Sequence, residues 1–368
     1  MWRLQAERMT ISPLSRAAAA EFAPEVTYLN TSSWGLLPRR TIAAVKALAD
    51  ENAVGRRTGA GSFDAVEAAR VGFARLAGVR PDRVATGSSV TVHVGLIAAS
   101  LPAGAEVLVP EGEFTSVVSP FALRGDLRMR YAPLAELADA VRPTTALVAF
   151  SSVQSADGRV ADLAAVRAAA AAHGARTLLD ATQSAGWFPL DAGAYDYTVA
   201  GGFKFLLCPR GTSFLTVTEE AQETLPRLFA GWVAAGAPWT RNYGPLDHLA
   251  PGARGFDEPP AFLSYHGAEH SLALLGEIGT DALYAHATSL AARLRAGLVE
   301  RGYEVVAGES AIVSVPGLEG RQPELAEAGV AVSAPAGNLR ISCHLYNTEA
   351  DVDRALEVLG RRGPDLPV

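Results

Sequence analysis

The sequence predicts an α/β protein, with a large domain built on a mainly parallel, doubly covered sheet and a smaller C-terminal α+β domain. From about residue 80, short apolar runs alternate with helical stretches, a pattern typical of parallel sheets with helices on both faces. After residue 218 the alternation stops and a segment rich in Gly, Pro and Trp begins. The length of 368 residues also favours two domains of unequal size.

The alternating part provides the strands and helices of the predicted sheet. We expect strands over 82–86, 105–110, 144–150, 175–180, 195–201 and 211–218, and helices over 87–101, 113–123 and 161–174. In such sheets, ligands bind outside the carboxyl ends of the strands. The polar residues at those ends are the first candidates for function: Ser88, Ser89, Asp180, Gln183 and Lys204.

The C-terminal part begins with an irregular segment whose aromatic residues are Trp232, Trp239 and Tyr243, among others. We expect these three near the substrate, at a subunit interface, or in ordinary packing. One long helix over 264–302 is followed by strands over 303–307, 311–317 and 338–345. A last helix starts at Thr348, where an acidic residue three positions on completes a capping signal.

These features divide the chain into three parts. Residues 1–30 form an N-terminal segment that packs on the small domain, 31–245 form the large domain, and 246–368 form the small domain.

Composition excludes several classes of protein. With 49% hydrophobic and 19% charged residues, the chain is typical of a soluble globular protein. The net charge of -7 disfavours a nucleic-acid-binding protein, and no apolar run is long enough to predict a membrane span. The two cysteines, Cys208 and Cys343, form neither a metal pattern nor a disulfide framework, which fits a reducing, cytoplasmic location.

The stretch "ATGSSVTVHVG" places Gly87, Ser88 and Ser89 on a turn between a strand and a helix. Free backbone N–H groups and two hydroxyls at a helix N-terminus suit a phosphate. A serine that only caps the helix is the alternative. The stretch matches neither the dinucleotide fingerprint nor the phosphate loop that ends in Gly-Lys-Ser/Thr.

In "LLDATQSAG", Asp180 ends an apolar strand. A carboxylate there is unfavourable unless it is hydrogen-bonded or paired with a cation. It either caps a turn or faces a cationic ring nitrogen, as a carboxylate does in pyridoxal phosphate enzymes. Gln183 lies three residues on, so its side chain can reach the same cleft.

Lys204 stands between "GGF" and "FLL", and the chain has only one other lysine, Lys46. A codon bias toward arginine can explain that scarcity, but an amine in apolar surroundings can act as a nucleophile, whereas a guanidinium is a poor one. Lys204 follows Asp180 by one strand, so both reach the same edge of the sheet. Near a phosphate site and a buried acid, this amine suggests a Schiff base with an aldehyde cofactor.

The segments "GSS", "EGEF", "SVQSADG", "DATQSAG", "GGFK" and "NLRISCHLYNTEAD" follow one another in an order that resembles the class V aminotransferase family of fold type I pyridoxal phosphate enzymes. The resemblance runs from "YLNTSSWGLLP" to the last helix. It is specific through order and spacing rather than through any single motif. The segments "GPLDHLAPGARGFDEPPAFLSYHGA" and "HLYNTE" are similar to the branch of isopenicillin N epimerase-like proteins and hercynylcysteine sulfoxide lyases.

The resemblance implies pyridoxal 5'-phosphate as the cofactor and a role for each matching residue. Lys204 would hold the cofactor and move the α-proton, Asp180 would pair with the ring nitrogen, and Arg340 would bind the substrate carboxylate. The remaining implied positions are Ser88 and Ser89 at the phosphate, Gln183 near the phenolic oxygen or the imine, Phe114 stacked on the ring, and Asn30 and Gln154 in the cleft wall. The resemblance also implies a homodimer with each active site at the interface and an amino-acid substrate.

Three positions depart from the family pattern. Gly201 and Phe203 stand where relatives often have a serine and a histidine before the cofactor lysine, and Pro259 stands where a partner subunit often provides a hydroxyl. These replacements remove expected phosphate and ring contacts, and Arg210 can compensate for the phosphate charge. They imply either loose cofactor binding or altered chemistry.

The positions of the two cysteines disfavour one reaction of the family, desulfuration through a nucleophilic cysteine. Desulfurases of this family carry a nucleophilic cysteine ahead of the carboxylate-binding arginine, and "EAGVAVSAPAGN" has none. We expect Cys208 and Cys343 to be buried packing residues. We therefore predict β-elimination of a C–S bond or transamination of an L-amino acid, with epimerisation as the third reaction. A non-catalytic, cofactor-binding relative with a regulatory or scaffolding role is the alternative from another class.

Overall fold

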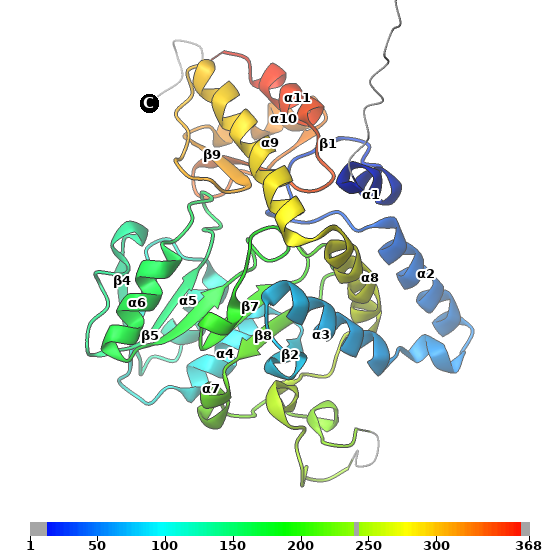
Figure 1. Ribbon diagram of the computed structural model, residues 1–368, viewed down its shortest axis with the longest axis vertical. Coiled ribbons are helices and arrows are strands. Elements are labelled where there is room, and N and C mark those ends of the chain that lie inside the picture. Colours follow the sequence, from blue (N-terminus) through cyan, green and yellow to red (C-terminus); the bar gives the residue numbers. More distant parts are fainter. Residues whose placement is uncertain (1–12, 239–242, 362–368) are drawn as a thin grey trace, which may run out of the picture.

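The computed structural model describes residues 13–238 and 243–361, and its centre is a seven-stranded sheet (Figure 1). The strands lie in the order β2-β8-β7-β6-β5-β3-β4. Their bounds are β2 Val84–Gly87, β3 Glu106–Pro110, β4 Arg128–Ala132, β5 Thr145–Ser151, β6 Arg176–Asp180, β7 Tyr197–Gly201 and β8 Ser213–Val217. Only β8 runs antiparallel to its neighbours, so the predicted mainly parallel sheet is confirmed.

Helices cover both faces of this sheet because its central strands are apolar on both sides. Val107 of β3 packs in one cluster with α4 (Val90–Ser100) and α5 (Thr115–Ala122). Its neighbour Leu108 packs on the opposite face with α6 (Leu163–His173). Further along that face lie α3 (Phe63–Ala77) and α8 (Phe262–Ile278), which pack against each other. The other helices of the region are α1 (Pro13–Glu21), α2 (Arg39–Ala53) and α7 (Glu219–Thr224).

The C-terminal elements gather at one end of the molecule (Figure 1). They are α9 (Thr280–Glu300), β9 (Ile312–Pro316), α10 (Gln322–Glu327), β10 (Val330–Ala331), β11 (Asn338–Ser342) and α11 (Glu349–Leu359). Strands β9 and β11 pair antiparallel, while β10 pairs with β1 (Thr27–Tyr28) of the N-terminal segment. The N-terminal segment therefore contacts the C-terminal elements, and the domain boundaries at 30 and 245 stay predictions.

Two of the elements expected in the C-terminal part differ from the prediction, and the capped last helix agrees. The long helix expected over 264–302 is two helices, because Gly279 between α8 and α9 takes a φ of 86°, which favours glycine and breaks the helix. The strand expected over 303–307 is absent, since only Val306 N–H donates to a carbonyl of β9, that of Ser314 (2.9 Å). Helix α11 begins at Thr348 with the expected capping box to Asp351.

The described parts of the segment between α7 and α8 are irregular, as expected, with short 3-10 turns at Trp232–Ala234 and Gly252–Phe256. Tyr243 is 94% exposed, the Trp232 ring contacts that of Phe63, and Trp239 lies outside the described residues. No helix in the described ranges is long and apolar enough to cross a membrane.

The carboxyl ends of the strands meet at one edge of the sheet. Ser213, at the start of β8, is the register partner of both Gly87 and Gly201, so β2 and β7, which flank β8, end at the same edge of the sheet. On the next strands, Asp180 ends β6 and is the register partner of Ser151 on β5. The loops that follow these strands therefore converge at this edge.

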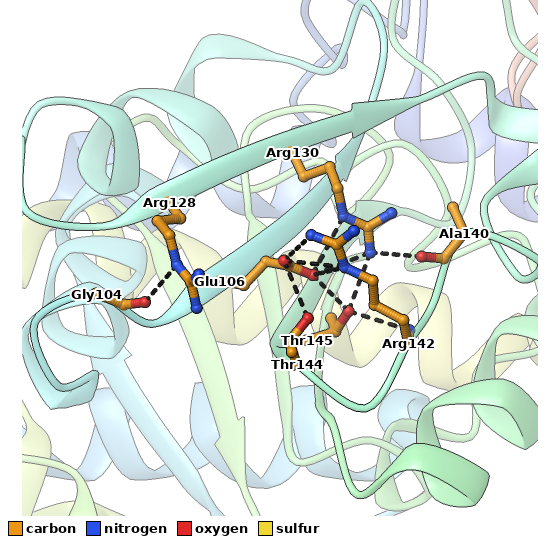
Figure 2. A network of polar contacts seen from close by, with 8 residues as sticks. All are labelled: Gly104, Glu106, Arg128, Arg130, Ala140, Arg142, Thr144 and Thr145. Carbon is orange, nitrogen blue, oxygen red and sulfur yellow. Dashed lines mark hydrogen bonds and ion pairs between the residues drawn. The ribbon is translucent and has the colours of Figure 1, made fainter.

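At the amino ends of β3 and β5 lies a closed ionic cluster (Figure 2). Glu106 begins β3 and is only 2% exposed, and it accepts hydrogen bonds from Arg130, Arg142 and Thr145. These contacts, the hydrogen bond from Arg142 above all, lower the pKa of Glu106 to about 2. The amino edge thus ends in a carboxylate whose partners are all provided by the protein.

Candidate active site

A cavity of about 490 Å³ opens at the carboxyl edge of the sheet. Seven of the residues predicted from sequence to act at the site or beside it line this cavity: Ser88, Ser89, Phe114, Asp180, Gln183, Lys204 and Arg340. They come from five loops or strands that lie far apart in the sequence. The fold therefore brings together the phosphate-type turn, the acid, the amine and the arginine that the sequence singled out.

Lys204 follows β7 by three residues and is 7% exposed. Its Nζ lies 5.1 Å from the centre of the Phe114 ring and 5.9 Å from that of Phe203. Burial lowers the pKa of this amine to about 8, although Asp180 nearby acts in the opposite direction. An amine with such a pKa is partly neutral near physiological pH, so it can act as a nucleophile and as a base.

Asp180 ends β6 and is 5% exposed. Its Oδ1 accepts from the backbone N–H of Thr182 (2.7 Å), and no ion pair joins it to any described residue. Burial raises the pKa of Asp180 to about 6, because little compensates for the loss of water around the carboxylate. This carboxylate is placed to receive a cationic N–H from a bound group.

Gln183 and Arg340 are joined through Ser155. Gln183 Nε2 donates to Ser155 Oγ (3.0 Å) and to the carbonyl of Ser32 (3.0 Å), while its Oε1 is buried without a partner. Arg340 Nη1 donates to both the carbonyl and the hydroxyl of Ser155, and Nη2 donates to Ser33 Oγ (2.8 Å). The two side chains are held rigidly at the wall, and Gln183 keeps an acceptor free.

Arg340 lies on β11 and is 5% exposed, yet it forms no ion pair among the described residues. Its guanidinium contacts only neutral oxygens, including Ser333 Oγ (3.1 Å). Burial lowers the pKa of Arg340 to about 10. Because a buried cation without a counter-ion is unfavourable, this residue is suited to bind a carboxylate that enters the cavity.

The turn between β2 and α4 places its two serines differently. Ser89 is the N-cap of α4 and accepts from Val92 N–H (3.4 Å). Ser88 donates its backbone N–H (3.3 Å) and its hydroxyl (2.8 Å) to the carboxylate of Glu258. Both serines still line the cavity.

Aromatic side chains surround the amine and a second arginine. The Arg210 guanidinium lies 4.5 Å from the centre of the Phe203 ring and 4.7 Å from that of Trp34, and these two rings meet edge to face. Arg210 lines the cavity and pairs with no carboxylate in the described part of the chain. The phenylalanine that departs from the family pattern thus holds an arginine by a cation–π contact.

Asn30 and Gln154 lie beside the cavity rather than in its lining. Gln154 Nε2 donates to Glu113 (2.9 Å), and Asn30 pairs with Ser342 through its backbone. The lining comes instead from their neighbours in the chain, Ser155 and the pair Ser32–Ser33. The larger polar residues of these segments, Asn30 and Gln154, are the ones predicted from the sequence to line the cleft. No pattern in the sequence tells which side chain of these segments points inward.

Both cysteines are buried, as expected. Cys208 is 1% exposed and Cys343 is fully buried. Burial raises the pKa of Cys343 to about 12 and that of Cys208 further still. Neither thiol lines the cavity, so neither can act as its nucleophile.

The donor set fits pyridoxal 5'-phosphate. The unpaired Asp180 carboxylate suits a protonated ring nitrogen, and the free Gln183 Oε1 suits a nearby donor. Lys204 would provide the amine for the aldehyde carbon, and Phe114 would provide an aromatic face for the ring.

Comparisons with known proteins show which families and folds the chain resembles. The chain is 31% identical to a kynureninase of Deinococcus radiodurans, covering 76% of this chain and 72% of that one. It is 28% identical to the isopenicillin N epimerase of Streptomyces clavuligerus, covering 91% and 94%. Its fold matches a complex of the cystine C-S lyase C-DES with its reaction product cysteine persulfide, with a TM-score of 0.83, 23% identity, and coverage of 92% and 98%.

The family model for aminotransferase class-V matches residues 27–355, which is most of the chain and includes every residue that lines the cavity. The chain therefore belongs to the class V aminotransferase family, and its cofactor is pyridoxal 5'-phosphate.

Proposed function

We propose that this enzyme is a lyase that removes a sulfur-linked β-substituent from an L-amino acid. One observation carries the proposal. Among the described residues that line the cavity, Lys204 is the only amine and Asp180 is the only carboxylate. A carboxylate that pairs with the ring nitrogen is not available as a general acid or base. The chemistry then has a single base.

The residues divide the work as follows. The bound cofactor supplies an electron sink for the bond electrons that remain when Cα loses its proton. Lys204 takes that proton at its Nζ, with a pKa suited to both taking and returning it. Asp180 would keep the ring nitrogen protonated, and Phe114 would provide an aromatic surface against which the ring can stack.

Substrate orientation rests on Arg340. Its guanidinium binds the α-carboxylate, while Ser33 and Ser155 hold it in place. Ser88, Ser89 and Arg210 would hold the cofactor phosphate, with Arg210 making up for the side chains missing at Gly201 and Phe203. Asn30 and Gln154 stay predicted members of the cleft wall.

A single base favours some reactions over others. Epimerisation by two bases needs a second proton donor on the opposite face of Cα, and the described lining includes no His, Cys, Tyr or Glu. Elimination and transamination both proceed with one lysine. The aromatic wall of Phe114, Phe203 and Trp34 favours elimination of a sulfur group, because thioether sulfur makes favourable contacts with aromatic rings.

Transamination is the second candidate, since the same lysine can return the proton to the cofactor instead. Epimerisation is the third, supported by the relatives named isopenicillin N epimerase. A non-catalytic role, regulatory or scaffolding, is supported only by the departures at Gly201, Phe203 and Pro259.

We also propose a homodimer with the active site at its interface, located in the reducing cytoplasm. Phe114, at 44% exposure, lines the cavity, and Trp34, at 48%, contacts the lining residues Phe203 and Arg210; a second subunit would cover these large exposed apolar side chains. The two free cysteines agree with the location. Sedimentation of the holoenzyme tests the dimer: a monomer at all concentrations contradicts it.

The cofactor link is tested first. We expect the purified holoenzyme to absorb in the visible range, and borohydride reduction followed by peptide mapping to place the label on Lys204. A label on Lys46, which is exposed on α2, contradicts the proposal.

The reaction is then tested with amino acids that carry sulfur leaving groups, such as cystine and S-alkylcysteine sulfoxides. Pyruvate and ammonia are the expected products, and L-serine is the matched poor substrate. Amino transfer to a keto acid without pyruvate would establish the aminotransferase instead. Exchange of the α-deuterium with no other product would establish the epimerase.

A further inference from the structure

The carboxylate of Glu258 lies on the turn assigned to the cofactor phosphate. Its Oε2 accepts from the Ser88 hydroxyl (2.8 Å) and its Oε1 from the Ser88 backbone N–H (3.3 Å). A phosphate oxygen would use the same two donors, because phosphate and carboxylate are both anionic acceptors. In this structure a protein side chain therefore occupies hydrogen-bond donors that the cofactor needs.

Glu258 is held there by the residue before it. Asp257 is 1% exposed, forms an ion pair with Arg70 (2.6 Å) and accepts from Thr86 N–H (2.8 Å). The backbone N–H of Glu258 in turn donates to the carbonyl of Thr86 (3.2 Å). The backbone of Glu258 is thus fixed to the end of β2, one step from the serine turn.

Gly87 makes the contact possible. A Cβ on Gly87 would lie 2.5 Å from Glu258 Oε1 and 2.6 Å from His93 Cε1, closer than a Cβ atom approaches other heavy atoms. Any larger residue at this position would push the Glu258 side chain off the turn. The absence of a side chain at Gly87 and the fixed backbone of Glu258 together build this contact into the fold.

The geometry points to Glu258 as an internal competitor of the cofactor phosphate. This inference rests on the proposed function of the site. Two anions on one pair of donors repel each other, so binding of the phosphate displaces the Glu258 carboxylate from Ser88. The need to displace the Glu258 carboxylate weakens the affinity of the turn for the cofactor phosphate. Lys204, Asp180 and Phe114 hold the aldehyde and the ring, and their contacts do not depend on Glu258.

The consequence concerns loading of the enzyme. A phosphate that must displace a carboxylate contributes less to cofactor binding than one that enters a free turn. The loaded fraction of the enzyme then follows the concentration of free cofactor. The replacements at Gly201, Phe203 and Pro259 act in the same direction, since each removes a contact the family usually makes.

The test separates the phosphate from the rest of the cofactor. Apoprotein is titrated with pyridoxal 5'-phosphate and, separately, with pyridoxal, which has the same ring and aldehyde but no phosphate. Binding is followed by absorbance. We expect Glu258→Gln to lower the Kd of pyridoxal 5'-phosphate by about tenfold, because the repelling charge is gone, and to leave the Kd of pyridoxal unchanged.

The matched control is Glu223→Gln, which removes the same charge from an exposed position on α7 and leaves both Kd values unchanged. Glu258→Ala repeats the test without any side-chain amide, and thermal unfolding checks that each variant folds.

An unchanged or higher Kd for pyridoxal 5'-phosphate in both Glu258 variants overturns the inference. So does an equal gain for pyridoxal, because the effect would not depend on the phosphate. If the wild type and the variants all fail to bind pyridoxal 5'-phosphate, the proposed function itself fails, and this inference with it.

Discussion

Two buried carboxylates, at opposite edges of the same sheet, have opposite surroundings. Glu106 at the amino edge is 2% exposed and receives two arginines and a threonine (Figure 2), and its pKa falls to about 2. Asp180 at the carboxyl edge is 5% exposed and accepts only from Thr182, and burial raises its pKa to about 6. Both carboxylates are buried, but in the described part of the chain only Glu106 has cationic hydrogen-bond partners.

This difference shows which edge is built for stability and which for a ligand. At the amino edge the protein provides every partner that the charge needs. At the carboxyl edge Asp180 lacks a cation, Arg340 lacks an anion, and Gln183 Oε1 lacks a donor, among the residues that the structure describes. Three incomplete groups in one cavity indicate a site whose remaining partners arrive with cofactor and substrate.

The largest expected effect is at the carboxyl edge. Lys204→Ala removes the amine that we propose to bind the cofactor and move the proton, so we expect kcat to fall by about 10⁴-fold or more. The measurement is product formation under saturating substrate and cofactor. Lys46→Ala, on the exposed face of α2, is the control and keeps full activity. Activity retained in Lys204→Ala would contradict the assignment of the carboxyl edge as the active site.

Asp180→Asn sharpens the comparison because it should change activity and stability in opposite directions. If Asp180 has its proposed role, the neutral amide no longer holds the proton on the ring nitrogen, and we expect kcat to fall by about 10²–10³-fold. In the apoprotein, the raised pKa means that Asp180 contributes stability that is full below pH 3.8 and lost as the pH rises through about 6. Above that pH, the variant is more stable than the wild type: its free energy of unfolding is higher by up to about 3 kcal/mol.

Denaturant unfolding of the two apoproteins between pH 4 and 8 measures this gap. It closes as the pH falls from 6 toward 3.8, where both side chains are neutral. Asp139→Asn, at an exposed site, is the control and shows no gap. A variant less stable than the wild type at pH 8 would mean that the Asp180 charge is satisfied after all.

Arg340→Ala tests the incomplete cation in the same cavity. Loss of the paired hydrogen bonds to the α-carboxylate lowers kcat/KM by about a hundredfold, mostly through KM. Arg340→Lys keeps the charge without the planar fork, so it recovers only part of the affinity. Equal KM values for the wild type and both variants would assign Arg340 to structure rather than to substrate.

The sequence was sufficient to predict the residues that end apolar strands. Asp180 and Lys204 follow apolar runs in a recognisable alternation, and both lie where the pattern indicates. Strand β4 escaped prediction because this edge strand alternates Arg, Met, Arg and Tyr and has little apolar signal. The order of segments located Arg340 but not the serines that hold it, since neighbouring residues differ only in which way they point.

Other features depend on contacts that the chain order does not encode. The hydrogen bond between Ser88 and Glu258 joins residues 170 positions apart. The split of the long helix at Gly279 depends on how α8 packs against α2 and α3, while α9 continues to the C-terminal elements. Such contacts follow from tertiary packing, which local propensity and periodicity leave open.

The smallest effect is expected at the amino edge and completes the contrast with Asp180. Glu106→Gln removes a charge that Arg142 and Arg130 stabilise, and we expect a loss of about 2 kcal/mol at pH 7, reduced from a fully buried pair because Arg142 is half exposed. Since the pKa of Glu106 is lowered, its contribution is full above pH 4.5 and lost as the pH falls through about 2. The gap between wild type and variant therefore closes on acidification, as it does for Asp180→Asn, but with the opposite sign. Cofactor affinity stays unchanged, because the cluster lies at the far edge of the sheet. A change in Kd for pyridoxal 5'-phosphate would show that the two edges are coupled rather than independent.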